Sequence, residues 1–155
     1  MLSLRTITKV AHAAGLEPPG FAGAHKVASG SMSEEQSEPY TATEQDPRQK
    51  AIDALIGNNN AAAPWVLKSP ALELIGYLPG DVLIVDLNRL PVARDIVCAQ
   101  HYHWSEARAD TIFRVFEPPY LITATHQHDL RRPLLVDNER VIIKGVVIFS
   151  LRTSP

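Results

Sequence analysis

The sequence predicts a mainly β fold: a strongly bent antiparallel sheet, preceded by a short N-terminal helix and a flexible linker. Two observations favour this class. Short apolar runs follow one another closely from Trp65 onward, and Val82–Val85 and Val141–Leu151 are the clearest of them. Little of the sequence between these runs has helical spacing, and turns containing proline or glycine separate them. Strands at this density are typical of an antiparallel domain with strong bends.

Two segments precede this β domain. Residues 1–19 are predicted to contain a short helix that ends near Gly15, because apolar side chains recur at helical spacing and two prolines follow. Residues 20–45 are rich in Gly, Ser, Ala, Glu and Thr and hold few large apolar side chains. Such a composition buries too little surface to order itself, so we expect a flexible linker there.

The β domain is expected to cover residues 46–155. It opens with a predicted helix over Pro47–Ile56, for which Asp46 is a suitable N-cap and proline a suitable first helical residue. Gly145, in the middle of the last apolar run, indicates a bulge or a close approach of another backbone segment. The strands predicted after the helix are Val82–Val85, Asp95–Tyr102, Thr111–Phe116, Tyr120–Thr123 and Val141–Leu151.

The composition argues against several classes of function. A formal net charge of −2 over 155 residues disfavours nucleic-acid binding through a broadly basic surface. The one cysteine, Cys98, excludes an intramolecular disulfide, and its apolar neighbours predict a buried thiol. No apolar stretch approaches the ~20 residues that cross a bilayer. We therefore expect a cytoplasmic protein that has no membrane partner and no cofactor.

The stretch Trp65–Asp86 carries the most informative motif. It reads as a short strand, a Ser-Pro turn, an apolar loop, the pair Gly80-Asp81 and a second apolar strand. This layout resembles the segment that holds the catalytic serine in the LexA/CI-type repressor peptidases, with Gly80 and Asp81 on the family's Gly-Asp pair. The resemblance implies a LexA-like bent β domain. Later segments resemble further motifs of the family in the same order; they are Pro91–Val97, in which Arg94 stands for a glycine, Thr111–Val115, Pro133–Asp137 and Val141–Val147.

The same resemblance bears on catalysis. In that family a serine hydroxyl attacks a peptide bond of its own chain, and a neutral lysine removes the hydroxyl proton. Here the alignment places Ala71 at the serine position and Phe113 at the lysine position. The resemblance therefore implies a pseudoenzyme that lacks both its nucleophile and its base.

An active self-cleaving peptidase is the alternative. Ser69 lies two residues before Ala71 and would be its nucleophile, with Lys68 directly beside it. Neighbouring residues on a strand point to opposite faces, so Lys68 is poorly placed to act as the base for Ser69. Pro70 after the serine favours a structural turn.

The function implied by the resemblance is transcription regulation by a phage- or prophage-type repressor. In such proteins this domain dimerises or forms higher oligomers, so the expected partner is a second copy, with a full-length repressor as a further partner. The interface is expected on the last strand, and the candidate residues are Val146, Ile148, Phe149 and Leu151.

The N-terminal residues resemble the last part of a Cro/CI-type helix-turn-helix domain, including the connection Ala14–Pro18. The recognition helix that enters the major groove has no counterpart in the sequence, so contact with DNA is expected to be indirect or weak. An ordinary amphipathic surface helix is one alternative. A mitochondrial presequence is another, because residues 1–16 hold Arg5 and Lys9 and no acidic side chain.

Four histidines form two H-x-H pairs, His101 with His103 and His126 with His128. On a strand, residues two apart share a face, so each pair would present two imidazoles to one metal ion. Four converging histidines would suit zinc, copper or nickel. Both pairs fall where strands are predicted to end, and exposed histidines are common there, so no metal site is expected. A metal- or small-molecule-binding β domain remains the other alternative.

Overall fold

The computed structural model describes residues 36–43 and 45–153. The predicted helix of residues 1–19 lies outside the described residues, and so do residues 20–35 of the predicted linker. The part of the linker that is described differs from the prediction, because Ser37–Pro39 forms strand β1 and pairs with the strand that follows α3.

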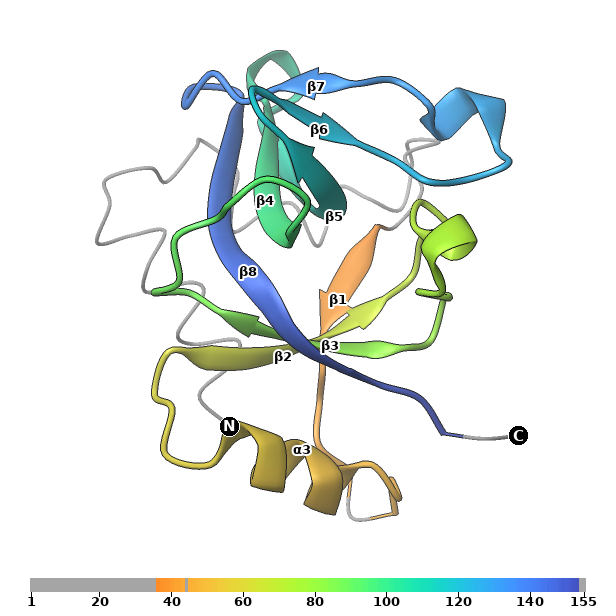
Figure 1. The fold of residues 1–155 in the computed structure, drawn as a ribbon, viewed down its shortest axis with the longest axis vertical. Coiled ribbons are helices and arrows are strands. Elements are labelled where there is room, and N and C mark those ends of the chain that lie inside the picture. The colour runs from red at the N-terminus through yellow and green to blue at the C-terminus, as the bar shows by residue number, and fades with distance from the viewer. Residues whose placement is uncertain (1–35, 44, 154–155) are drawn as a thin grey trace.

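The fold is mainly antiparallel β, as predicted (Figure 1). Within the described residues, eight strands form one sheet in the order β1-β2-β3-β8-β4-β5-β6-β7, and every neighbouring pair is antiparallel. Helix α3 spans Gln49–Ile56. The strands are β1 Ser37–Pro39, β2 Ala62–Leu67, β3 Val82–Asp86, β4 Ile96–His103, β5 Arg108–Glu117, β6 Tyr120–Ile122, β7 Leu134–Leu135 and β8 Val141–Leu151.

Strand β8 lies at the centre of the sheet and joins its two halves. Its first half pairs with β4 and its second half pairs with β3. The register with β4 shifts at Lys144, and the register with β3 shifts at Ile148, so each position holds one extra residue of β8. Extra residues of this kind increase the local twist and bend a strand. Figure 1 shows the resulting curve of β8 across the front of the molecule.

The close backbone approach predicted at Gly145 is confirmed. A Cβ atom added to Gly145 would lie 2.7 Å from the backbone oxygen of Asp86 and 2.7 Å from Cγ1 of Val85. Both distances are below normal van der Waals contact, so only glycine lets the end of β3 pass β8 at this point.

Hydrophobic clusters hold the sheet and helix together. The first contains Trp65 and Phe113 from β2 and β5, together with side chains of β3 and β4. The second lies under β4, β5 and β8 and includes Val146. The third joins Tyr40 and Ile52 to the start of β3, and so attaches α3 to the sheet.

Helix α3 begins two residues later than predicted. Pro47 and Arg48 form a turn before it, and Oδ1 of Asp46 accepts a hydrogen bond from the Arg48 N–H at 2.8 Å. Asp46 also accepts from the Gln49 N–H through its backbone oxygen at 3.1 Å. Asp46 thus stabilises the turn that leads into α3.

Strand β1 is ordered by contacts that its composition does not reveal. Tyr40, which follows β1, is buried. Its backbone N–H donates a hydrogen bond to the backbone oxygen of Pro64 at 3.1 Å. The Ser37 hydroxyl donates to the backbone oxygen of Thr111 on β5 at 2.6 Å. The second contact links β1 to β5, although four strands lie between them in the order of the sheet. Among the described residues, no helix has the length and apolar character of a membrane span.

Candidate functional site

Ala71 lies in the turn that follows β2. It is 0% exposed, and its backbone oxygen accepts a hydrogen bond from the Ala124 N–H at 2.8 Å. The Leu74 N–H in turn donates to the oxygen of Ala124 at 2.9 Å. The chain around Ala124 therefore covers this turn, and a buried methyl group stands where the resemblance expects a serine hydroxyl.

Phe113 fills the centre of the first hydrophobic cluster. It is fully buried on β5, and its ring meets Trp65 edge to face, with the centroids 6.5 Å apart at an angle of 62°. A lysine amine in this apolar environment would cost several kcal/mol unless it had a partner. These apolar surroundings therefore suit the aromatic ring that stands where the resemblance expects a lysine.

Ser69 and Lys68 are engaged in other contacts. Ser69 is buried, and its Oγ accepts a hydrogen bond from the Ala71 N–H at 3.2 Å. The Nζ of Lys68 lies 2.8 Å from Oε1 of Glu38 on β1. No basic side chain of the described residues makes a hydrogen bond with Ser69 Oγ. The geometry of Ser69 is that of a serine that stabilises a turn.

Cys98 and Lys144 are the buried thiol and the buried amine of the domain. Cys98 is free and buried, as predicted, and burial raises the pKa of its thiol to about 12, with Lys144 opposing the shift. Lys144 is 9% exposed and occupies the bulge of β8 opposite β4. Burial lowers the pKa of its amine. In the described part of the chain, neither side chain makes a hydrogen bond with Ser69.

The Gly80-Asp81 pair has a structural role. Gly80 has φ of +97°, the left-handed conformation that favours glycine. Asp81 is buried and accepts hydrogen bonds from the Leu78 N–H at 2.9 Å and from Nε and Nη2 of Arg152 at 2.7 Å. Burial raises the pKa of Asp81, but the Arg152 guanidinium and the Leu78 N–H outweigh burial, so this pKa is lowered overall. The pair ties the loop before β3 to the end of β8.

Arg94 stands where the motif of the resembled family has a glycine. Its φ is +75°, so the backbone there has the left-handed conformation that favours glycine. Its N–H donates to the oxygen of Phe116 at 2.7 Å and holds the turn in place. The backbone at Arg94 thus has a conformation that glycine would adopt without strain.

The interface candidates on β8 differ in exposure. Val146 is 1% exposed and belongs to the second hydrophobic cluster, so its assignment to an interface is corrected: it is a core residue. Ile148 and Leu151 are half-buried, and Leu151 packs on the cluster under α3. Phe149 is 43% exposed and is the candidate that faces solvent.

The four histidines do not converge. His101 and His103 lie side by side on β4, and burial, followed by the charge of His103, lowers the pKa of His101 to about 4. His126 and His128 are exposed on the loop between β6 and β7. In the described part of the chain, no three or more His, Cys, Asp or Glu side chains are grouped so that they could hold a metal ion. A four-histidine site is therefore absent from these residues.

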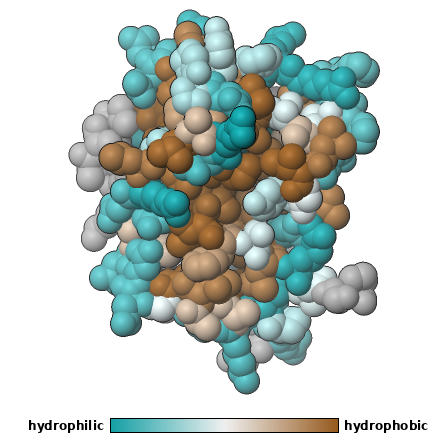
Figure 2. Space-filling view, viewed as in Figure 1, coloured by the Kyte–Doolittle hydropathy of each residue, from teal (hydrophilic) through white to brown (hydrophobic). Residues whose placement is uncertain are grey.

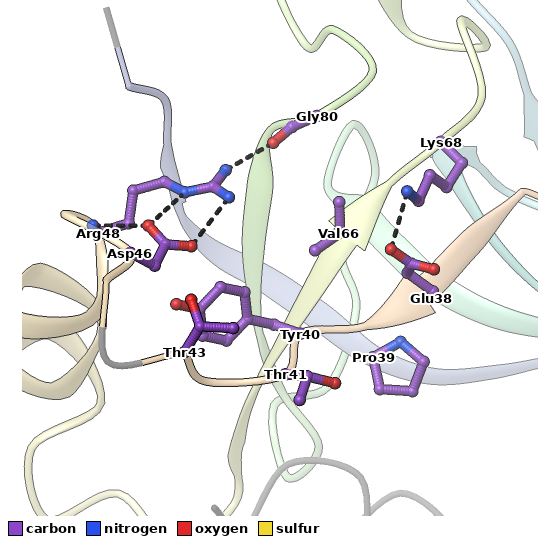
Figure 3. A pocket seen from close by; sticks show the side chains of 10 residues that line it. All are labelled: Glu38, Pro39, Tyr40, Thr41, Thr43, Asp46, Arg48, Val66, Lys68 and Gly80. Atoms are coloured by element: carbon purple, nitrogen blue, oxygen red, sulfur yellow. Dashed lines mark hydrogen bonds and ion pairs between the residues drawn. The ribbon is translucent and has the colours of Figure 1, made fainter.

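A cavity of about 670 Å³ lies between β1 and the start of α3 (Figure 3). Two ion pairs flank it: Arg48 with Asp46 at 3.1 Å and Lys68 with Glu38 at 2.8 Å. Hydrogen bonds from Arg48 lower the pKa of Asp46 to about 2, and the Arg48 guanidinium carbon lies 5.9 Å from the centroid of the Tyr40 ring. Figure 3 shows Tyr40 and Val66 between the two pairs. The sequence did not indicate this cavity, because part of its wall belongs to the predicted linker.

No protein-family model matches the chain, and no curated protein matches it. The resemblance to the LexA/CI-type repressors therefore rests on the sequence motifs.

Proposed function

We propose that this chain is a regulator of the LexA/CI type whose peptidase site is inactive and whose β domain acts in self-association. The alanine and phenylalanine at the serine and lysine positions support the loss of catalysis, since both are buried apolar side chains. The observation that carries self-association is the second half of β8, which has an unpaired edge among the described residues and an exposed Phe149.

Two features make the second half of β8 a suitable interface. Beyond Val146, β8 pairs only with β3 among the described residues, so its other edge has no strand partner there. Phe149 is exposed on this stretch, and Figure 2 shows hydrophobic side chains gathered across the middle of the face on which β8 lies. An unpaired edge is a template for another strand, and the same strand of a second copy is complementary to it about a twofold axis.

The partners follow from this arrangement. A second copy is the first partner, and a full-length repressor with the same β8 edge is another. DNA would be engaged weakly, or indirectly through such a partner. A regulator of this phage or prophage type would act in the cytoplasm.

The experiment is sedimentation equilibrium of the full chain and of its Phe149→Ser variant. We expect the variant to self-associate at least roughly tenfold more weakly, because loss of about 1 kcal/mol of burial in each copy acts twice in a symmetric dimer. Leu135→Ser is the matched control, since Leu135 is 50% exposed on β7, a strand that does not pair with β8. An equally large effect in both variants, or a monomeric wild-type chain at high concentration, would overturn the proposal.

A further inference from the structure

His101 and His103 form a paired imidazole surface on β4. They are alternate residues of one strand, so their side chains leave the same face of the sheet. Their ring centroids are 4.2 Å apart, with the ring planes tilted by 46°. Both side chains are half-buried, so water and small ions can reach them. Two imidazoles held this close by a strand need little movement to bind one ion together.

A carboxylate on the neighbouring strand orients one of the two rings. Oδ2 of Asp110 on β5 lies 3.1 Å from Nε2 of His103, and Asp110 is the cross-strand partner of His101. When Nε2–H donates to this carboxylate, Nδ1 of His103 carries the lone pair. A carboxylate behind one imidazole nitrogen is the usual outer partner of a histidine that binds a metal through its other nitrogen.

Charged groups of both signs lie around the pair of rings. Arg108 lies on β5 opposite His103, with its Nε 2.7 Å from Oε2 of Glu106 and its Nη2 3.9 Å from Oδ2 of Asp110. The buried guanidinium of Arg114 is the other cation nearby. The Asp110 carboxylate and the two guanidinium groups thus act on the pKa of His101 in opposite directions.

We propose that His101 and His103 form a two-imidazole binding site for a late first-row divalent metal ion, with Cu²⁺ preferred over Ni²⁺ and Zn²⁺. Nitrogen donors select these ions over Mg²⁺ and Ca²⁺, and Cu²⁺ is the tightest of the series for a given set of donors. Because no third side chain joins the pair in the described part of the chain, the remaining coordination positions are open to water or to a second ligand.

The second H-x-H pair is a control supplied by the chain itself. His126 precedes the short 3-10 helix His128–Leu130, and the two residues do not lie on a strand. Their spacing in sequence equals that of His101 and His103, but their backbone does not place alternate side chains on one face. The proposal therefore assigns metal binding to one pair and not to the other.

The test is a Cu²⁺ titration of the full chain near neutral pH, followed by electron paramagnetic resonance. We expect one tight ion per chain, with hyperfine splitting from two imidazole nitrogens. His101→Gln and His103→Gln should each weaken binding by roughly ten- to a hundredfold and remove one nitrogen from the spectrum. The double variant His126→Gln/His128→Gln should bind as the wild type does. His12 and His25 are present in every variant and contribute equally to all of them.

Asp110→Asn tests the positioning role of the carboxylate. It should weaken Cu²⁺ binding by about tenfold and leave the hyperfine splitting from two imidazole nitrogens unchanged. A substitution that displaced the histidine rings would alter that splitting as well. Circular dichroism establishes that each variant is folded, and His103→Gln, at the end of β4, decides the question if His101→Gln does not fold. Loss of the tight ion in the His126/His128 variant, or its full retention in His103→Gln, would overturn the proposal.

Discussion

Phe113 and Ala71 are the two residues on which the proposed loss of catalysis rests. A hydroxyl needs a base within hydrogen-bond reach before it can attack a peptide bond. Phe113 provides a hydrophobic ring packed on Trp65, and Ala71 provides a methyl group under the chain at Ala124. Both side chains improve packing where a hydroxyl and an amine would need partners. Both side chains therefore contribute to the packing of the domain.

Arg94 gives the first prediction. A non-glycine residue in the left-handed conformation costs roughly 1–2 kcal/mol, and Arg94 has φ of +75°. Arg94→Gly should therefore raise the free energy of unfolding by about 0.5–1 kcal/mol, after the greater freedom of glycine in the unfolded chain is subtracted. Urea denaturation measures this change. The control is Ala93→Gly, since Ala93 does not have a positive φ, and it should lower the stability by about 0.4–1 kcal/mol. A variant at Arg94 that is less stable than the wild type would contradict this reading of its backbone.

At the scale of elements, β8 organises the domain. It carries the two register shifts that bend the sheet, and its residue Gly145 allows β3 to cross. Just beyond its end, Arg152 is paired with Asp81 in the loop before β3. The same strand thus sets the curvature of the sheet and anchors the loop that carries the Gly-Asp motif.

The Asp81–Arg152 pair gives a pH-dependent prediction. The pKa of Asp81 is lower in the folded chain than in the unfolded chain, so its contribution is present above the unfolded pKa of about 3.9 and is lost as the pH falls through the lower folded value. Asp81→Asn should lower the free energy of unfolding near pH ~7 by about 1.5–3 kcal/mol, since it removes charge-assisted hydrogen bonds. The difference from the wild type should shrink on acidification to pH ~3 and below.

Urea denaturation across this pH range measures both effects. The control is Asp129→Asn, because Asp129 is exposed on the loop between β6 and β7. This variant should follow the acid dependence of the wild type. If the free energy of unfolding differed between Asp81→Asn and the wild type by the same amount at every pH, the Asp81–Arg152 ion pair would not be the source of the lost stability.

The elements show which signals in the sequence are reliable. Strands β3, β4, β5, β6 and β8 form where the apolar runs predict them, and β8 has the predicted bounds. The short strands β1 and β7 were not predicted, because neither carries an apolar run long enough to stand out. Helix α3 was predicted with its start two residues too early, since the Asp46 side chain stabilises a turn rather than the first helical turn.

At the scale of the whole molecule, the proposed loss of peptidase activity can be tested directly. Prolonged incubation near pH ~10 makes lysine side chains neutral and so favours any serine–lysine self-cleavage. We expect a single uncleaved intact mass, because Ser69 Oγ is held by the Ala71 N–H and Lys68 is held by Glu38. Intact-mass spectrometry makes the measurement. Two fragments that sum to the whole chain plus one water, and that disappear in Ser69→Ala, would mean that Ser69 is an active nucleophile.

The sequence alone determined the mainly antiparallel β class, the central strands, the buried thiol of Cys98 and the close approach at Gly145. These features follow from apolar runs, glycine and proline, whose effects act within a few residues of chain. The tertiary structure alone decided that Val146 is core while Phe149 is exposed, and that Asp110 orients His103. The tertiary structure also decided that β1 forms, because the Ser37 hydroxyl on β1 donates a hydrogen bond to Thr111, 74 residues away in the sequence. Contacts of that kind depend on how the whole sheet bends, and no local pattern in the sequence records them.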